Sequence, residues 1–484
     1  MDVVEYALHD GLGLAELIGR GDASVSEVAG AALEARALVD PQVRAVVETY
    51  DEAVRRTDAD LGDGPFHGVP FLIKDIGPHF AGLKVEFGSR LCEGYVAIED
   101  DHFARLVKES GVNLVGRSNT PEFSMALCAD NLLYGATSNP WRAGYSTSGS
   151  SGGAAAAVAA GIVPVAHGSD MGGSIRGPAA WCGTVGLQPS RGRVSWGPFS
   201  SESPDGMAQS FVLTRSVRDT AAMLDCLGRP QPGDPFVIPR PGRPYLSYAG
   251  EGGGRLRVAW SAAPLMDAPV DPEVAETVER AAAVLEGLGH EVVEGAPPID
   301  LDAIDRALLD IWYFRFDKYL DGLAAKVGRS VGPDTVGRAT LRFYELACAQ
   351  DPESYFAALS ALNTHRQAIG PFFATCDVWL SPTCAQVAQP NGVYGMDIDL
   401  PADEFIAHEE APCQFMIPYN VTGQPAISLP LALHSNGLPI GVQLGARPSE
   451  EHLLIQLAAE LERAMPWGDR PPGLHVSSLR EGTR

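Results

Sequence analysis

Two stretches rich in glycine and serine carry residue types that could do chemistry. They are residues 144–153 (GYSTSGSSGG) and Gly168–Gly177 (GSDMGGSIRG). Glycine at this density predicts loops rather than regular structure. In the second loop, Asp170–Ser174 (DMGGS) sets two glycines before a serine, and glycine backbones can turn successive N–H groups toward one point. Such donors beside a serine suit the oxyanion of an acyl-transfer reaction, although a plain tight turn has the same composition.

Phosphate binding is a second interpretation of these loops. Phosphate-binding loops run into Gly-Lys-Ser or Gly-Lys-Thr, and dinucleotide-binding loops place Gly-x-Gly-x-x-Gly between a strand and a helix. Neither pattern occurs around the two loops. The sequence therefore favours acyl transfer over phosphate or dinucleotide binding.

The elements predicted around the loops alternate between strands and helices. Val69–Ile73 predicts a short buried strand with Lys74 at its end, and Val163–His167 predicts a strand that leads into the second loop. Between them, the small residues of Ala154–Gly161 predict a helix that follows the first loop. The same alternation continues along the chain, so we expect the α/β class.

The overall charge and the cysteines exclude several classes of function. The chain has 61 acidic and 36 basic residues, and its formal net charge of −25 repels phosphate backbones and anionic membranes. The eight cysteines are scattered without metal-ligand spacing, which predicts free thiols in a reducing compartment. We expect no nucleic-acid or membrane partner, no metal and no cofactor.

The N-terminal segment and the apolar runs indicate where the protein works. Met1–Glu5 is acidic and lacks the basic region of a signal peptide. The most apolar run, Ala154–Val163, is too short to cross a bilayer. These two observations predict a cytoplasmic protein.

Six short segments stand in order along the chain: Gly68–Asp75, Asn119–Phe123, Gly149–Gly153, Gly168–Arg176, Cys182–Leu187 and Thr422–Ala426. In this order and spacing they resemble the amidase signature family. The resemblance extends over nearly the whole chain, is most specific over residues 140–196 and is weakest over 240–400. Three further stretches (64–66, 166–170 and 464–467) are similar to the nylon-oligomer branch of the family, the aminohexanoate cyclic-dimer hydrolases.

The resemblance implies a fold and a set of reacting groups. The fold is the amidase-signature fold, in which a large mixed β-sheet is covered by helices on both faces. The reacting groups form a Ser–cisSer–Lys triad, with Ser174 as nucleophile, Ser150 after a cis peptide bond as proton relay, and Lys74 as base. The implied donors to the oxyanion are the backbone N–H groups of Met171, Gly172, Gly173 and Ser174.

Further residues are expected to support this site. Asp170 and Arg176 flank the nucleophile and match a pair found beside it in the family. Ser151 and Ser169 either support the triad or cap backbone groups, as short polar residues in loops often do. The residues expected to line the substrate pocket are Met125 and Ala126.

The identity of the base has one competing interpretation. A lysine is normally charged and cannot accept a proton, but burial lowers its pKa, and Lys74 closes an apolar strand. His167 and Asp170 lie near Ser174 in the sequence, and Ser/His/Asp is the commoner hydrolase set. However, no Gly-x-Ser-x-Gly elbow surrounds Ser174. We therefore favour Lys74 as the base.

The 484 residues are expected to form a single amidase domain. Within it we predict N-terminal helices over 1–60, the signature core over 61–230 and a variable covering segment at about 240–400. An aromatic cluster in that covering segment either packs in the core or walls an apolar pocket, and aromatic residues on helices commonly pack inward. The cluster is Trp312, Tyr313, Phe314, Phe316 and Tyr319.

Three activities fit this machinery. The expected one is a stand-alone amidase for small aryl, linear or cyclic amides, with a small-molecule amide as its partner; a homodimer is compatible with this activity. The second is hydrolysis of carbamates (urethanes) or esters by the same triad. The third is a glutamine-dependent amidotransferase subunit, which would need partner subunits and is disfavoured by the acidic surface.

Overall fold

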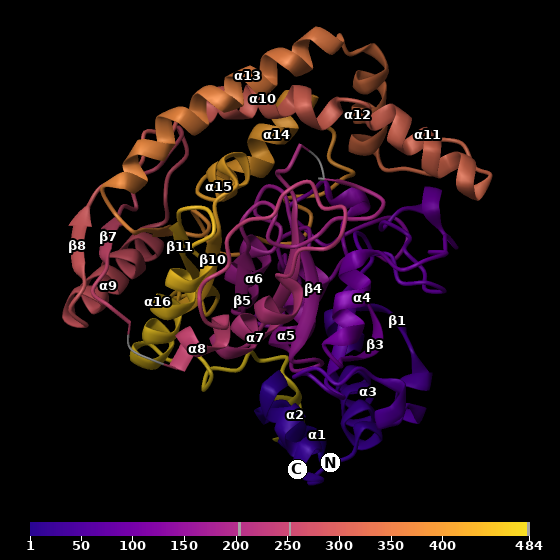
Figure 1. Ribbon diagram of the computed structural model, residues 1–484. Helices are drawn as coiled ribbons and strands as arrows, with labels where there is room; N and C mark the ends of the chain where they lie inside the picture. Colours follow the sequence, from indigo (N-terminus) through magenta and orange to yellow (C-terminus); the bar gives the residue numbers. More distant parts are fainter. Residues whose placement is uncertain (202–204, 251–252, 482–484) are drawn as a thin grey trace.

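One mixed β-sheet runs through the molecule in the computed structural model, which describes residues 1–201, 205–250 and 253–481 (Figure 1). Its strands are β1 Val46–Thr49, β2 Pro70–Lys74, β3 Asn113–Ser118, β4 Val165–Asp170, β5 Val185–Gln188, β6 Gln209–Thr214, β7 Arg257–Trp260, β8 Glu291–Glu294, β9 Val378–Pro382, β10 Ala426–Leu433 and β11 Pro439–Ala446. Among the described residues these eleven strands lie side by side in the order β1-β3-β2-β4-β6-β5-β10-β11-β9-β7-β8.

The direction of the strands changes along the sheet. Strands β3, β2 and β4 are parallel neighbours, and so are β9, β7 and β8. The pairs between these two groups are antiparallel, as is the pair of β1 with β3. The predicted α/β class with a large mixed sheet and helices on both faces is confirmed.

Helices connect the strands and cover the sheet. Their bounds are α1 Val3–Leu8, α2 Gly11–Arg20, α3 Val25–Val43, α4 His102–Glu109, α5 Gly152–Ala159, α6 Arg176–Cys182, α7 Val217–Leu227, α8 Tyr245–Gly250, α9 Pro272–Gly287, α10 Leu301–Tyr313, α11 Phe316–Val327, α12 Arg338–Ala349, α13 Pro352–Ile369, α14 Ala402–Glu410, α15 Ile417–Thr422, α16 Glu451–Ala464 and α17 Val476–Glu481. Short 3-10 helices lie at Asp51–Arg55, Asp58–Asp60, Arg90–Cys92, Glu122–Ser124, Gly370–Ala374 and Ala411–Cys413.

The second glycine-rich loop is shorter than the sequence predicts. Residues 168–170 belong to β4, and Arg176 already begins α6, so the loop is reduced to residues 171–175. The reason is tertiary pairing, since β4 forms an antiparallel ladder with β6 in which Ser169 faces Ser210 and Asp170 faces Gln209. Strand pairing thus overrides the weak local preference of these small residues for strand structure.

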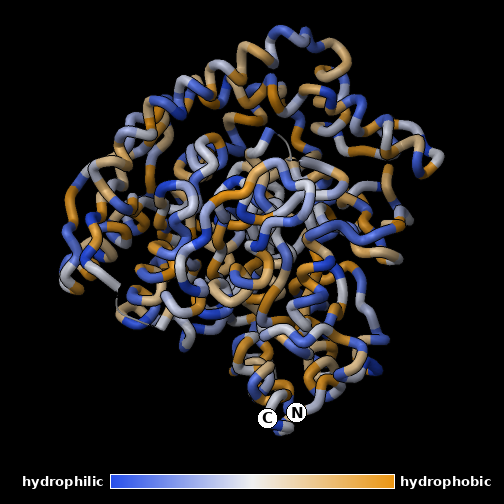
Figure 2. The backbone as a smooth tube through the Cα atoms, in the orientation of Figure 1, coloured by the Kyte–Doolittle hydropathy of each residue, from blue (hydrophilic) through white to orange (hydrophobic). Residues whose placement is uncertain are grey.

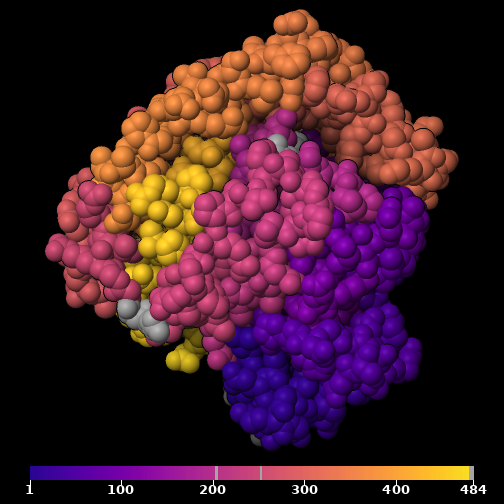
Figure 3. Space-filling view, in the orientation of Figure 1, coloured from indigo at the N-terminus to yellow at the C-terminus, as the bar shows by residue number. Residues whose placement is uncertain are grey.

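The helices from α10 to α13 form an arch over one end of the sheet, drawn in orange at the top of Figure 1. Along this arch hydrophilic and hydrophobic residues alternate (Figure 2), which is typical of helices that pack on protein with one face and meet water with the other. In the space-filling view the arch stands over the loops of the core, with a hollow beneath it (Figure 3). Residues 240–400 do more than cover the core, because β7, β8 and β9 of the sheet also come from this range.

Two further features concern the whole chain. None of the helices in the described ranges is long and apolar enough to cross a membrane. The eight cysteines are free thiols, as predicted, and all of them except Cys348 are buried.

Candidate active site

Lys74 is the last residue of β2, and its side chain is only 1% exposed. Strand β2 has a parallel neighbour on each side, so its end lies inside the sheet rather than at an edge. The Lys74 Nζ is 2.6 Å from the Oγ of Ser150, 3.1 Å from that of Ser151 and 3.0 Å from that of Ser169. The strand therefore brings the predicted lysine together with three of the predicted serines.

The surroundings of Lys74 change its acid–base chemistry. Burial lowers the pKa of Lys74 from 10.5 to about 7, because the charged amine loses its hydration, and the Asp170 carboxylate only partly offsets this effect. A neutral amine has a lone pair that can accept a proton. At 2.6 Å from the Ser150 hydroxyl, the amine is within the distance that proton transfer requires.

Ser150 follows a cis peptide bond to Gly149, as the family resemblance implied. Gly149 lies against neighbouring backbone so closely that a Cβ there would be 2.0 Å from the carbonyl oxygen of Ala126. Only glycine fits at this place. The backbone N–H of Ser151 donates to the carbonyl of Ser174 at 3.1 Å, which holds the two loops together, and Ser150 and Ser174 line the same cavity.

The loop before Ser174 is organised by the Asp170 carboxylate. Its oxygens accept the backbone N–H groups of Gly173 at 2.8 Å and of Ile175 at 3.1 Å. Gly173 has a φ of 118°, and a Cβ on it would lie 2.6 Å from the side chain of Met416. The Gly173 N–H was predicted to donate to the oxyanion. In the structure it donates to the Asp170 carboxylate instead, so it is not free to bind an oxyanion.

Asp170 and Arg176 form a fully buried ion pair through two contacts of 3.0 Å each. Although burial acts to raise it, the pKa of Asp170 lies below its ordinary value because Arg176 and hydrogen bonds stabilise the carboxylate. Two residues that sequence reasoning missed complete the arrangement. Asn420 donates to Asp170 at 2.9 Å and accepts from Arg176 at 2.7 Å, and Gln443 accepts from Arg176 at 3.2 Å.

His167 is fully buried and has partners at both ring nitrogens. The backbone N–H of Lys74 donates to its Nδ1 at 3.3 Å, so the ring proton lies on Nε2, which is 2.8 Å from the Oγ of Ser210. Burial, and then the nearby Lys74, hold the pKa of His167 well below its ordinary value. Neither nitrogen is directed at Ser174, so this geometry does not favour the competing Ser/His/Asp set.

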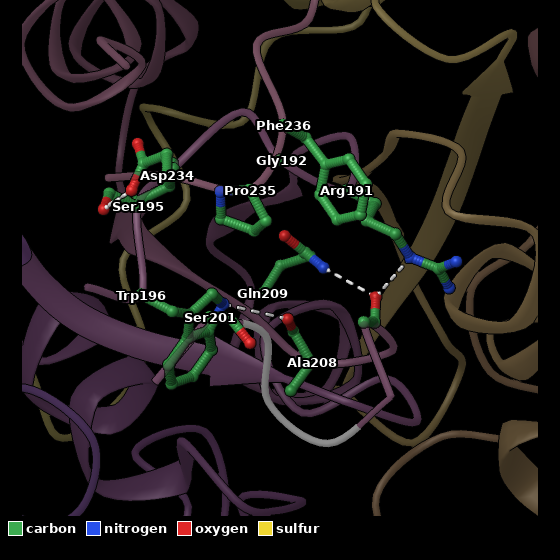
Figure 4. Close-up of a pocket in the computed structure, with 12 residues that line it drawn as sticks. Arg191, Gly192, Ser195, Trp196, Ser201, Ala208, Gln209, Asp234, Pro235 and Phe236 are labelled. Atoms are coloured by element: carbon green, nitrogen blue, oxygen red, sulfur yellow. Dashed lines mark hydrogen bonds between the residues drawn. The ribbon is translucent and has the colours of Figure 1, made fainter. Parts of the chain in front are cut away.

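Ser195 and Asp234, with His102 behind them, form a second group of serine, histidine and aspartate. Ser195 and Asp234 line a small cavity, which Figure 4 shows in close-up. The Ser195 hydroxyl donates to Asp234 at 2.5 Å, and His102 Nδ1 is 2.9 Å from the same hydroxyl. Here the serine bridges the other two residues, whereas a nucleophilic serine would donate to the histidine. The cavity holds about 20 Å³, room for about one water molecule. This group is therefore structural.

The cavity that opens onto Ser150 and Ser174 holds about 660 Å³. Helices α10 and α11 of the arch supply one wall, and Met125, Ala126 and Met171 lie on the core side. Most of the aromatic cluster lines this cavity, and Trp312 and Phe316 also pack against buried hydrophobic residues. The exception is Tyr313, which packs on Phe343 with ring centroids 5.2 Å apart. The aromatic residues of the cluster that line the cavity are Trp312, Phe314, Phe316 and Tyr319.

Comparison with known proteins agrees with this geometry. Residues 27–455 match the Amidase family. The chain is 36% identical over 480 residues to a 6-aminohexanoate-cyclic-dimer hydrolase of Paenarthrobacter ureafaciens, covering 96% of each protein. The chain belongs to the amidase signature family. The predicted membership and the predicted similarity to the nylon-oligomer branch are confirmed, and the protein is an amide-hydrolysing enzyme.

Two solved structures show how far the enzyme's fold is shared. The structure of a 6-aminohexanoate cyclic dimer hydrolase complexed with substrate gives a TM-score of 0.91 at 35% identity, covering 97% of this chain and 99% of that one. A bacterial aryl acylamidase of the amidase signature family gives 0.87 at 26% identity, covering 97% and 98%. The similarity therefore includes the arch as well as the signature core.

The enzyme's cavity also contains acidic residues that the sequence did not single out. Glu409 and Glu410, at the end of α14, line the cavity although both are buried. Charged residues on a helix usually face water, so no local pattern predicts this placement. In the described ranges no group of three or more His, Cys, Asp or Glu residues is arranged to hold a metal ion.

Proposed function

We propose that the enzyme hydrolyses small non-peptide amides (aryl, linear or cyclic) through Ser174, Ser150 and Lys74. The observation that carries the proposal is the 2.6 Å contact between Lys74 Nζ and Ser150 Oγ, at a lysine whose pKa burial lowers to about 7. A lysine in this state is a base near neutral pH. Without a base, a serine hydroxyl is a weak nucleophile.

Acylation begins with two proton transfers. Neutral Lys74 takes the proton of the Ser150 hydroxyl while Ser150 takes that of Ser174, and the Ser174 oxygen attacks the amide carbonyl carbon. The carbonyl oxygen becomes an oxyanion. Because Asp170 occupies the Gly173 N–H, we assign the stabilising hydrogen bonds to the backbone N–H groups of residues 171, 172 and 174.

The intermediate then collapses and the C–N bond breaks. The proton held by Lys74 returns through Ser150 to the leaving amine, which departs and leaves an ester between the acyl group and Ser174. Water, deprotonated through the same relay, attacks the carbonyl carbon of this ester. The C–O bond to Ser174 then breaks, the proton returns from Lys74 through Ser150 to the Ser174 oxygen, and the acid is released. The buried pair of Asp170 and Arg176 changes no charge in the cycle, and its role is to hold the loop in shape.

The cavity supports the expected class of substrate. Its aromatic wall suits an apolar or aryl body, and its volume of about 660 Å³ suits a small molecule rather than a protein segment. Relatives named as a cyclic-dimer hydrolase and as an acylamidase support non-peptide amides. We propose the same for this chain, acting on its own.

A panel of substrates tests the proposal. We expect hydrolysis of aryl acylamides, aliphatic amides or cyclic diamides, and loss of it in Ser174→Ala. Matched aryl carbamates and esters measure the alternative activities, and a higher kcat/KM for carbamates would replace the amide assignment. Glutamine as the sole good substrate, with co-purifying subunits, would favour the amidotransferase alternative. If no amide in the panel is cleaved, the proposal fails.

A further inference from the structure

Six aromatic rings line the active-site cavity in a continuous row, which we call the aromatic belt. Each ring contacts the next, with centroids between 5.4 and 6.4 Å apart. The inner end lies near the reacting groups, because the second ring belongs to the 3-10 helix that leads to Ala126, whose carbonyl lies against Gly149. In order, the rings are those of Phe316, Phe123, Phe87, Tyr95, His79 and Phe199.

The backbone holds two of these rings in strained positions. Phe87 and Phe123 have φ angles of 57° and 50°, in the left-handed region that bulky residues rarely adopt. Phe87 is kept there by Asp75, whose carboxylate accepts the backbone N–H groups of both its neighbours, Glu86 at 2.7 Å and Gly88 at 3.0 Å. Such strain persists only where the surrounding structure enforces it, and it gathers at ligand-binding sites. The belt therefore has the features of a binding surface rather than of ordinary core packing.

Lys326 lines the cavity beside the outer part of the belt, and its Nζ lies 5.7 Å from the ring centroid of Tyr95. Arg329, just after α11, fixes this end of the helix to the loop that carries Tyr95, because it donates to the carbonyl of Glu93 at 2.6 Å. Both Lys326 and the last ring of the belt, Phe199, are exposed. The ammonium group thus lies where the cavity meets solvent.

Lys326 has no carboxylate partner in the described part of the chain. The sequence has five lysines, and three of the others form ion pairs: Lys84, Lys108 and Lys318. The fourth, Lys74, contacts the serines of the active site. In a protein with a formal net charge of −25, an unpaired cation beside an apolar cavity is placed to attract an anion from outside the chain.

His79 supplies a second donor next to Lys326. Its half-buried imidazole lines the cavity, and among the described residues nothing hydrogen-bonds to either ring nitrogen. Burial, and then the positive charge of Lys326, lower the pKa of His79, while the exposed Glu99 acts less strongly in the opposite sense. Near neutral pH the ring is therefore neutral and offers one N–H. The neighbouring Asp101 carboxylate does not compete for this donor, since it accepts the backbone N–H of His79 at 2.8 Å and of Ala104 at 2.7 Å.

We propose that Lys326 and His79 bind a carboxylate group of the substrate, at the far end of an apolar chain that the aromatic belt covers. This rests on the function proposed above. A carboxylate only accepts hydrogen bonds, so it matches two donor groups that lack acceptors in the described part of the protein. The preferred substrates are then amides that keep a free carboxylate, with the reacting amide at the opposite end of the chain.

Matched substrates test the proposal in the wild-type enzyme. On the acyl side, suberic acid monoanilide is compared with octanoyl anilide, in which a methyl group replaces the carboxylate. On the amine side, N-benzoyl-8-aminooctanoate is compared with N-octylbenzamide. We expect kcat/KM to favour the carboxylate member of at least one pair about fivefold or more, mainly through a lower KM, as for a partly exposed ion pair. The preference should shrink in about 1 M sodium chloride, which screens exposed charges.

Substitutions connect this preference to the two donors. In Lys326→Met the preference should fall about fivefold, and His79→Phe, which keeps a ring but removes the N–H, should lower it about twofold. Lys326→Glu should reverse the preference, so that the ammonium compound N-benzoyl-1,8-diaminooctane is cleaved better than N-benzoyl-8-aminooctanoate. Lys318→Met is the matched control, because Lys318 lies on the same helix and the change of net charge is the same, but Lys318 pairs with Asp317 and does not line the cavity.

Because Lys326 is exposed, its variants should fold and the comparison is decisive. The inference is overturned if the methyl members are cleaved as well as the carboxylate members, or if the preference survives in Lys326→Met. A loss of the same size in Lys318→Met would also overturn it, by showing a general effect of net charge. An unchanged preference in His79→Phe would overturn the role of His79. If no member of either pair is cleaved, the proposed function fails instead.

Discussion

The Nζ of Lys74 lies 2.6 Å from the Oγ of Ser150, at the buried end of a strand that has a neighbour on each side. In water the Lys74 amine would carry a positive charge and the Ser150 hydroxyl would keep its proton, so neither group would act as a base. Burial lowers the pKa of Lys74 to about 7, so near neutral pH the amine is neutral in a large share of molecules.

The first prediction concerns the dependence of activity on pH. Only neutral Lys74 can take a proton, so kcat/KM should rise as pH increases through about 7 and then level off. The measurement is a kcat/KM profile between pH 5 and 9 on an aryl acylamide without ionisable groups. A profile that falls through this range would contradict the assignment, because it would require the protonated amine.

Replacing the lysine separates activity from stability. In Lys74→Met we expect kcat/KM to fall by about 10²–10⁴-fold, as when a general base is lost. Folded Lys74 titrates near 7 and unfolded lysine near 10.5, so in the wild type the unfolded chain binds more protons between these values and stability rises with pH there. This contribution should disappear from denaturation curves of the variant at pH 7, 8.5 and 10. Lys318→Met, at an exposed position, is the control.

His167 should prove to be structural. Its Nδ1 accepts from the backbone N–H of Lys74 and its Nε2 faces Ser210, so no proton route to Ser174 passes through it. In His167→Gln we expect the kcat/KM profile to keep its midpoint near pH 7, with some loss of thermal stability because a buried side chain changes shape. Loss of activity in a folded His167→Gln, together with an active Lys74→Met, would reverse the assignment of the base.

The two glycines before the nucleophile should respond differently to the same substitution. Gly173 has a φ of 118° and an added Cβ would lie 2.6 Å from Met416, whereas a Cβ on Gly172 meets Ile417 only at 3.7 Å. We expect Gly173→Ala to lower kcat about 10²-fold or more by displacing the oxyanion loop, and Gly172→Ala to keep most of the activity. Equal effects on kcat in the two variants would show that backbone strain and the Met416 contact do not set the loop.

The parts of the site that could be predicted from the sequence are those encoded locally. Lys74, Ser150 and Ser174 each lie in a short segment with a recognisable pattern, and two of them sit in loops that glycine makes necessary. The local pattern predicted the start of the second loop wrongly. Residues 168–170 belong to strand β4, because they pair with β6, which lies far along the chain.

Other residues reach the site from distant parts of the chain, and no local sequence pattern marks them as site residues. Asn420 contacts Asp170 across 250 positions, and nothing around it distinguishes it from an ordinary helical asparagine. Glu409 and Glu410 likewise end a helix whose earlier acidic residues are exposed. Their burial is decided by the packing of α14 under α10, which is a tertiary property.

The last prediction concerns the buried pair of Asp170 and Arg176. In Asp170→Asn the guanidinium loses its buried countercharge, and we expect the free energy of unfolding to fall by about 3–5 kcal/mol. The exposed pair of Arg20 and Asp22, 2.8 Å apart, is the control, and Asp22→Asn should change stability by less than about 1 kcal/mol. Urea denaturation of both variants at pH 8 measures the difference. Because the Asp170 carboxylate also holds the Gly173 N–H, residual activity should fall as well, even at temperatures where the variant stays folded. An Asp170→Asn protein as stable as Asp22→Asn would mean that Asn420 and Gln443 suffice to hold Arg176.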